Sequence, residues 1–240
     1  MRIDRLLVER GLFESRAKAQ AAIAAGQVTA DGVVVAKPSA EVAVDAVLHA
    51  QGAHPYVSRG GVKLAAALDH FGFDPKGRVC LDVGASTGGF TQVLLARGAR
   101  RIYAVDTGHG QLHASLLARP EVVLSFEGTS IRHLLQAHLP EPPDFICIDA
   151  SFISLRLVLP SALALARFPA RLVALIKPQF EAGRRALKKG IVRDGAIHDA
   201  VCDDISEFVT SLGWQVAGIM PSPIFGAAGN REFFIGATRD

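Results

Sequence analysis

The chain has 240 residues, of which half are hydrophobic and 20% are charged, and its net charge at pH 7 is +3. This length allows one large domain, or an ordinary domain with a small module, and the apolar content excludes global disorder. The amino terminus does not resemble a signal peptide, and the most apolar stretch, 157–176, is interrupted by proline and arginine. We therefore expect a soluble, cytoplasmic protein with no membrane partner. Cys80, Cys147 and Cys202 lie far apart and form no Cys/His cluster, so we expect free thiols and no metal.

Residues 1–52 are predicted to form a small module of two helices and a hairpin. The first helix stops at Gly11, and the second runs from a Ser15 cap to Gly26. The Asp-Gly pair in the stretch QVTADGVVVA is a strong signal for a hairpin turn. The apolar residues expected to face inward from the two helices are Ile3, Leu6, Leu7, Ala19, Ala22 and Ile23.

This stretch resembles the S4 RNA-binding domain over about residues 2–50. The matching residues are Arg2-Ile3-Asp4, Ser15-Arg16, Ala19, Gly26, Val28 and Gly32. The resemblance implies that the helical face of the module grips structured RNA, with Arg2, Arg5, Arg16 and Lys18 as candidate contacts. On charge alone these four residues would be read as a solvated face, because basic and acidic residues balance in this part of the chain.

Residues 53–60 are predicted to be a linker, and residues 61–240 a second domain in which strands and helices alternate. Continuously apolar strands separated by helices indicate a parallel sheet that is covered on both faces. The last two strands, WQVAGIMPS and REFFIGAT, have too short a connection for a crossover helix, so we expect them to be antiparallel. The predicted fold class is a Rossmann-like α/β methyltransferase sheet with an antiparallel carboxyl-terminal strand, beside the small α+β module. The apolar runs of the parallel strands end at Asp82, Asp106, Phe126, Asp149 and Lys177.

The stretch DVGASTGGFT, directly after an apolar strand, is typical of a loop that wraps a nucleotide-like ligand. An acid at the end of the next strand, Asp106, is placed to accept hydrogen bonds from ribose hydroxyls, which suits NAD and S-adenosylmethionine equally. Ser86 stands where the dinucleotide fingerprint requires its second glycine, and this favours S-adenosylmethionine. The predicted cofactor-binding residues are Asp82, Gly84, Ala85, Ser86, Thr87, Gly88, Gly89 and Asp106, with Glu127 and Ser130 flanking the adenine.

Two charged residues close apolar strands of the predicted sheet. Asp149 ends the strand in IDASFIS, and Lys177 ends the strand in LIKPQFEAG. Either residue alone could simply mark where solvent begins. Because the carboxyl ends of parallel strands meet at one edge of a sheet, both together predict a polar site there.

The motifs SRGGVKL, DVGASTGGFT, IDASFIS, IKPQFEAG and GNREFF together resemble the TlyA family, S4-fused relatives of the FtsJ-type ribosomal RNA 2′-O-methyltransferases. The resemblance runs from Arg2 to about Gly236 and implies a catalytic tetrad. Its members fall on Lys63, Asp149, Lys177 and Glu232. It further implies a cytidine ribose of ribosomal RNA as substrate, with ribosomal RNA or a ribosomal subunit as partner. One departure is the stretch HPYV before SRGG, where the family has a more basic sequence containing tryptophan.

The tetrad makes chemical sense for a ribose hydroxyl, which is a weak nucleophile. A lysine kept neutral or poised by its neighbours can accept the hydroxyl proton. The family implies this role for Lys177, an alkoxide-stabilising role for Lys63, and orienting roles for Asp149 and Glu232. The assignment of the base between the two lysines comes from the resemblance and not from their spacing.

Seven basic residues and a single acid, Glu181, occur between Arg171 and Arg193. The segment GRRALKKG adjoins the catalytic lysine, which favours phosphate contact over a merely solvated loop. The candidate RNA contacts outside the module are Arg59, Arg184, Arg185, Lys188 and Lys189.

Three other functions compete with this interpretation. An NAD(P)-dependent oxidoreductase would share the glycine loop and Asp106, and a non-catalytic RNA-binding protein would use the methyltransferase fold as a platform. A complete tetrad argues against the second. A membrane-lytic protein is disfavoured, because the sequence holds no membrane span and no amphipathic cationic helix.

Overall fold

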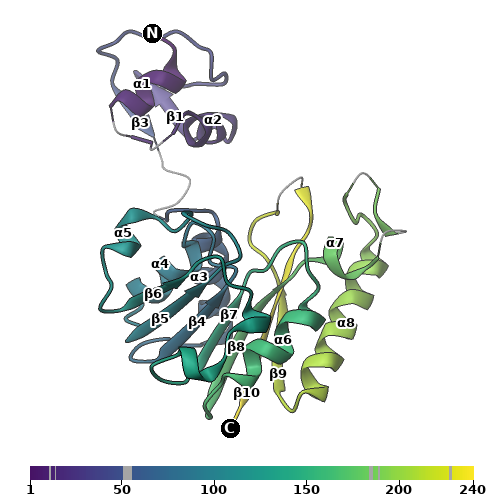
Figure 1. Cartoon of the computed structure of the whole chain (residues 1–240). Coiled ribbons are helices and arrows are strands. Elements are labelled where there is room, and N and C mark those ends of the chain that lie inside the picture. Colours follow the sequence, from purple (N-terminus) through teal and green to yellow (C-terminus); the bar gives the residue numbers. More distant parts are fainter. Residues whose placement is uncertain (11, 14, 51–55, 184–185, 189, 227–228) are drawn as a thin grey trace. The chain divides into compact units, whose positions relative to one another are not determined.

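A computed structural model describes residues 1–240 with the exception of 11, 14, 51–55, 184–185, 189 and 227–228 (Figure 1). Contacts divide the chain into two units, Met1–Pro55 and Tyr56–Asp240, and this division falls inside the predicted linker. Each unit has its own hydrophobic core.

The described residues of the first unit form two helices and a three-stranded antiparallel sheet of order β2-β1-β3. Ser15 caps the second helix as predicted, because its side chain accepts a hydrogen bond from the Lys18 amide. The hairpin is also confirmed, since Asp31 and Gly32 both have positive φ, as a two-residue turn of this kind requires. The predicted stop of the first helix at Gly11 lies outside the described residues. The elements are α1 (Ile3–Glu9), α2 (Arg16–Ala24), β1 (Val28–Ala30), β2 (Val33–Val34) and β3 (Leu48–Ala50).

The second unit is built on a seven-stranded sheet of order β6-β5-β4-β7-β8-β10-β9. Its first five strands are parallel, and β10 is antiparallel to both β8 and β9, as the short last connection predicted. The strands are β4 (Val79–Val83), β5 (Arg101–Val105), β6 (Val123–Phe126), β7 (Phe145–Ile148), β8 (Ala170–Ile176), β9 (Gln215–Pro221) and β10 (Phe233–Arg239).

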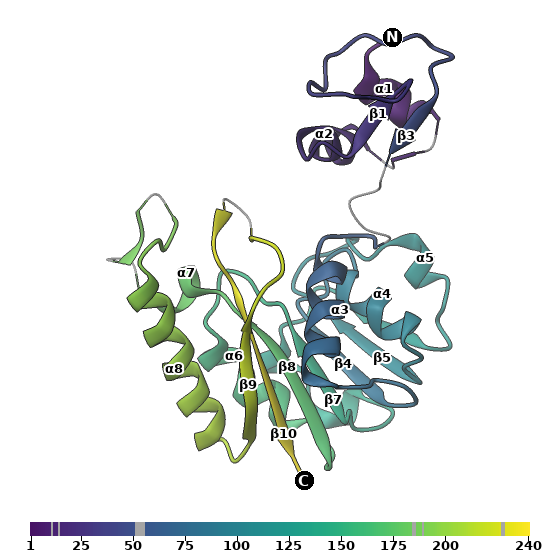
Figure 2. The ribbon, with the colours of Figure 1, turned by 180° about the vertical axis from the view of Figure 1, so that it is seen from behind.

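Helices cover both faces of this sheet, so its central strands are buried on both sides. In Figure 1, α6 and α8 lie in front of the sheet, and Figure 2 shows α3 and α4 on the opposite face. Among the described residues, the helices are α3 (Gly60–Phe71), α4 (Gly89–Ala96), α5 (Ala114–Leu117), α6 (Leu155–Ala164), α7 (Pro178–Glu181) and α8 (Gly195–Ser211), and short 3₁₀ turns include η1 (Ile131–His133) and η2 (Gln136–His138).

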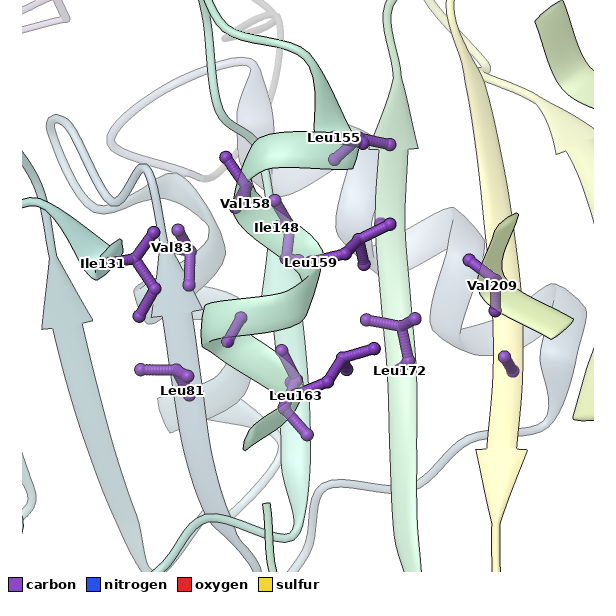
Figure 3. Packing of buried hydrophobic residues seen from close by; sticks show 14 of the residues in the cluster. Leu81, Val83, Ile131, Ile148, Leu155, Val158, Leu159, Leu163, Leu172 and Val209 are labelled. Atoms are coloured by element: carbon purple, nitrogen blue, oxygen red, sulfur yellow. The ribbon is translucent and has the colours of Figure 1, made fainter. Parts of the chain in front are cut away.

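Successive side chains of a strand point to opposite faces of the sheet, so the apolar residues of the strands pack in two separate cores. On one face Leu81 and Val83 of β4 pack with Leu159 and Leu163 of α6 (Figure 3). On the other face Cys80 and its neighbours pack with residues of α3 and α4. All three cysteines are buried free thiols. Helices on both faces leave the carboxyl ends of the parallel strands as the edge at which polar loops gather.

Strand β6 ends at Phe126 as predicted, whereas the ends of β4, β5, β7 and β8 are each one residue off. Strand β4 continues to Val83, so Asp82 lies inside the strand and is inaccessible to solvent. Asp106, Asp149 and Lys177 instead stand directly after β5, β7 and β8. Among the described residues, no helix combines the length and apolar character needed to span a membrane.

Candidate active site

The glycine-rich loop, residues 84–89, leaves the end of β4 and lies close to the end of β7. Gly84 and Gly88 have φ of +84° and +95°, a left-handed conformation that glycine adopts without steric cost. Packing also excludes a side chain at Gly84, because its Cβ would lie 2.6 Å from the carbonyl oxygen of Asp149. The loop therefore runs directly beside the backbone that carries Asp149.

The segment SRGG, residues 58–61, supports the other side of this loop. A Cβ at Gly89 would lie 2.2 Å from Ser58 Oγ, so the start of α4 packs closely against the start of α3. Gly61 is confined by Tyr56, since its Cβ would lie 2.2 Å from the ring carbon Cγ. Tyr56 belongs to the stretch HPYV, which departs from the family pattern. The two residues before it in the sequence, His54 and Pro55, lie outside the described residues. These contacts place the helix that carries Lys63.

Two lysines and two carboxylates meet in pairs at the carboxyl edge of the sheet. Lys177 follows β8, and its Nζ lies 2.7 Å from Oδ1 of Asp149, which follows the neighbouring strand β7. In α3, Lys63 donates to Oε2 of Glu232, directly before β10, over 2.6 Å. Lys63, Lys177 and Glu232 are 8%, 7% and 3% exposed. Ionised groups this deeply buried need partners of opposite charge, and each pair supplies one.

All four side chains line one cavity of about 340 Å³. Its wall also contains residues of the glycine loop, from Gly84 to Thr87 together with Gly89, and Arg59 of the SRGG segment. The structure therefore brings the predicted catalytic residues and most of the predicted cofactor loop to a single site. A ligand in this cavity would meet two cationic groups, each with its own carboxylate.

The turn before β10 holds Glu232 in place. A Cβ at Gly226 would lie 2.0 Å from Oε1 of Glu232, so the carboxylate packs against the bare backbone of this glycine. The amide of Gly226 donates to the carbonyl of Asn230 over 2.9 Å, which keeps these two residues close together. Gly226 was not singled out from the sequence, because nothing local marks it as a neighbour of Glu232.

Three predicted cofactor contacts, Asp106, Glu127 and Ser130, are not among the described residues of the cavity wall. Asp106 accepts hydrogen bonds from the amides of Ser86 and Gly108, over 2.8 and 2.7 Å. Glu127 accepts from the amides of Gln111 and Leu112, and these bonds lower the pKa of its carboxyl group. Ser130 stands at the start of η1. Asp106 thus ties the glycine loop to Gly108, and Glu127 ties the end of β6 to Gln111 and Leu112.

Asp82 has a different environment from the one predicted. Its carboxylate accepts a hydrogen bond from the Thr91 hydroxyl over 2.6 Å, and complete burial raises its pKa to about 7. The group lies under the glycine loop, and it is not among the described residues that line the cavity. Its place in β4 ties the strand to the first turn of α4 through Thr91.

Sequence reasoning missed two residues of the IDASFIS motif. The hydroxyl of Ser151 accepts a hydrogen bond from Lys177 Nζ over 2.7 Å. Phe152 is 91% exposed, has φ of +63°, and faces Phe180 with ring centroids 5.3 Å apart. Both residues line the cavity. The motif itself was the available signal, but spacing alone does not show which of its residues turn toward Lys177.

The predicted RNA contacts of the first unit include two arginines that share one acid. Asp4 is buried and accepts hydrogen bonds from Arg2, Arg16 and Gln20. The bonds from Arg2 and then Arg16 hold the pKa of its carboxyl group well below the usual range. The side chains of Arg2 and Arg16 remain 41% and 46% exposed.

The structure describes four of the other predicted RNA contacts. Arg5, Arg59 and Lys188 are exposed, and Lys18 is half-buried. Arg184, Arg185 and Lys189 lie outside the described residues.

The fold and the site together define a class of protein. The sheet is mostly parallel, a glycine-rich loop follows β4, and the antiparallel strand β10 lies between β8 and β9. This is the architecture of Rossmann-like methyltransferases. The chain belongs to the FtsJ-like methyltransferase family, whose family model matches residues 56–239, and residues 1–48 match the S4 domain. The family predicted from the motifs is thereby confirmed.

Similar proteins agree with this assignment. The 16S/23S rRNA (cytidine-2′-O)-methyltransferase TlyA of Mycobacterium tuberculosis is 41% identical over 98% of this chain and 88% of its own length. A solved structure from Streptococcus thermophilus, which carries a provisional hemolysin name, is 39% identical and has a TM-score of 0.80 over 100% of this chain and 88% of that chain. The 1,6-didemethyltoxoflavin-N1-methyltransferase of Burkholderia thailandensis, 19% identical with a TM-score of 0.54 over 75% of this chain and 77% of its own, shares the fold alone.

Proposed function

We propose that this protein transfers a methyl group from S-adenosylmethionine to the 2′-hydroxyl of a cytidine ribose in ribosomal RNA. The observation that carries the proposal is the pair of lysine–carboxylate contacts on the wall of one cavity beside the glycine loop. The substrate class is supported by the name of the Mycobacterium tuberculosis relative, which is similar over nearly the whole chain.

The glycine loop suits the proposed cofactor. Gly84 and Gly89 line the cavity with bare backbone, which a ligand can approach closely. We assign Gly84 to Gly89 to the methionine end, Asp106 to the ribose hydroxyls, and Glu127 and Ser130 to the adenine. When bound, the cofactor supplies a methyl carbon on a sulfonium sulfur, which the ribose oxygen attacks as the carbon–sulfur bond breaks.

Lys177 acts as the general base in this proposal. Its nitrogen is nearly enclosed and is bound to Asp149, so it can accept the hydroxyl proton only from a group placed in the cavity. Lys63 stabilises the negative charge that develops on the ribose oxygen, and Glu232 holds Lys63 in place. Most of the rate enhancement should come from the positioning of the two substrates by the same cavity wall.

Phe152 offers a surface for the nucleobase. Phe152 is 91% exposed at the cavity wall and has a left-handed backbone conformation. Both features destabilise the folded protein, and packing of the ring does not offset this cost. Stacking of an unpaired base on an aromatic ring contributes about 1–3 kcal/mol per base. Together with Phe180, this ring would hold the base while its ribose faces the two lysines.

The first unit and the basic segment after Lys177 hold the rest of the RNA. Arg2 and Arg16 keep about half of their side-chain surface free while Asp4 fixes their guanidinium groups. Arg5, Lys18, Arg59 and Lys188 supply further positive charge. Arg184, Arg185 and Lys189 are assigned to the same role from the sequence alone. These contacts should orient the RNA without reading its sequence.

Mapping of 2′-O-methyl groups tests the proposal. Ribosomal subunits from cells that lack the protein are incubated with S-adenosylmethionine and either the wild-type chain or Lys177→Ala. We expect new methyl groups on one or a few cytidine riboses with the wild type and none with the variant. Methylation of a base, or no methylation by a wild type that binds S-adenosylhomocysteine, would refute the proposal.

A further inference from the structure

We propose that Ser151 is a positioning residue that orients the nitrogen of Lys177 for proton transfer, an inference that rests on the proposed function. Ser151 lies two residues beyond Asp149, in the turn that leaves β7, and Lys177 leaves the adjacent parallel strand β8. Because the two strands end at the same edge, both oxygen atoms reach the same ammonium group. Lys177 Nζ lies 2.7 Å from Oδ1 of Asp149 and 2.7 Å from Oγ of Ser151.

Two oxygen neighbours limit where the free position of the Lys177 nitrogen points. The nitrogen is tetrahedral, with one bond to its side chain and three remaining positions. In the neutral form two of these positions are N–H groups and the third is the lone pair. With one N–H group donated to Oγ of Ser151, and the Asp149 carboxylate 2.7 Å away as the ion-pair partner, the lone pair takes the position left to a group in the cavity that all three side chains line.

The other lysine of the site has a different arrangement. Among the described residues, the ammonium group of Lys63 has one hydrogen-bond acceptor, Oε2 of Glu232 at 2.6 Å. With a single acceptor the remaining two positions of the nitrogen can exchange by rotation, which suits a charge that stabilises an oxyanion and needs no fixed lone pair. Lys177 has a hydrogen-bonded hydroxyl, Oγ of Ser151, beside its ion-paired carboxylate, and this second oxygen neighbour distinguishes the two lysines and assigns the base to Lys177 on geometry.

The exposure of Lys177 and of Ser151 fits the positioning role. Lys177 is 7% exposed, whereas Ser151 is exposed and lines the cavity directly. The hydroxyl of Ser151 is therefore available to hold the amine without sealing it from a ligand. In the proton transfer, the 2′-hydroxyl proton moves to the lone pair of Lys177, and its electron pair stays on the ribose oxygen. Ser151 keeps its own proton throughout.

Single-turnover methylation of ribosomal RNA by the full chain tests this role. We expect Ser151→Ala to lower the rate at saturating substrates by at least tenfold, with the KM for RNA and the affinity for S-adenosylhomocysteine within twofold of wild type. Ser151→Thr keeps a hydroxyl acceptor and should recover the rate to within about threefold. Ser154→Ala is the structural control: this serine caps α6 and binds Glu181, and it is not among the described residues that line the cavity.

Three results would overturn the inference. The first is an unchanged rate in Ser151→Ala, and the second is a Ser151→Thr variant as slow as Ser151→Ala, since the hydroxyl acceptor would then be irrelevant. The third is a rate loss in Ser154→Ala equal to that in Ser151→Ala, which would indicate a general disturbance of the motif. A wild-type chain that methylates no RNA would refute the proposed function itself, whereas an active wild type with an equally active Ser151→Ala would refute only the role of Ser151.

Discussion

Lys63 and Glu232 are 169 residues apart in the chain, and their side chains form a 2.6 Å ion pair in the interior of the protein. The pair joins the first helix of the methyltransferase unit to the residue before its last strand. In the sequence, Lys63 precedes and Glu232 follows the second pair of the cavity, Asp149 and Lys177. Each lysine is therefore matched with one carboxylate. This pairing underlies both the stability and the proposed chemistry of the site.

Breaking the Lys63–Glu232 pair from one side should destabilise the larger unit. Lys63→Met leaves a carboxylate that is 3% exposed without its cation, and loss of one partner of a buried pair costs about 3–5 kcal/mol. Urea unfolding can be followed through Trp214, the single tryptophan of the chain, which is buried in this unit. Arg97→Met, which breaks an exposed pair with Asp69, is the control and should cost less than about 1 kcal/mol. Equal losses for the two variants would contradict the importance of burial here.

A methyl group at Gly226 should displace Glu232. The Cβ of Gly226→Ala would lie 2.0 Å from Oε1, so the carboxylate must move and Lys63 loses its fixed partner. We expect methylation to fall at least tenfold while S-adenosylhomocysteine still binds, as measured by calorimetry. Gly195→Ala introduces the same methyl group where no atom lies within 4 Å, and it should leave the activity intact. A fully active Gly226→Ala would show that Glu232 need not be held in place.

Asp82 should make stability depend on pH in an unusual direction. Burial raises its pKa from 3.8 to about 7, so the folded protein holds a proton that the unfolded chain releases. The free energy of unfolding should therefore fall as the pH rises from about 4 to about 7, by at most about 4 kcal/mol, and this contribution should level off above pH 7. Asp82→Asn mimics the protonated group and should remove this contribution, so that the variant matches or exceeds the wild type at pH 8. Asp69→Asn, at an exposed position, serves as the control. An Asp82→Asn variant that loses stability at pH 8 would mean that the charged form is the favoured one.

Charge reversal on the first unit should weaken RNA binding without changing the chemistry. Arg5 is exposed on α1, next to the arginines that Asp4 holds, and it is a predicted phosphate contact. Arg5→Glu should raise the KM for RNA and reduce the salt dependence of binding by about one unit of log–log slope. The rate at saturating RNA should not change. Lys76→Glu makes the same change at an exposed position of the other unit. Equal effects of the two variants would indicate attraction by net charge alone.

The fold could be read from the sequence because its signals are local. Apolar runs that end in charged residues identify the strands, and the short connection before Phe233 predicts the antiparallel end of the sheet. Strand ends were less certain, as Asp82 shows, because the step from strand to loop after Val83 depends on the pairing of β4 with β5 and β7. The tendency of residues to form strands does not determine where that pairing stops.

The site was only partly predictable. Motifs identified both lysines and both carboxylates, but the sequence could not show that Lys63 pairs with Glu232 and Lys177 with Asp149. Such pairs depend on which loops the completed sheet brings together. The roles of Ser151 and Gly226 have the same origin, because each residue acts on a partner from a distant part of the chain.

The most direct measurement of the central claim is single-turnover methylation of ribosomal RNA by wild type, Lys177→Ala and Lys177→Arg, with S-adenosylhomocysteine binding measured in parallel. If Lys177 is the general base, both variants should bind the cofactor product and transfer almost no methyl group, because a guanidinium stays protonated and cannot accept the hydroxyl proton. Digestion of the wild-type product should yield 2′-O-methylcytidine. An active Lys177→Arg would contradict the account, since a fixed positive charge would then be enough and the proton would have to leave by another route.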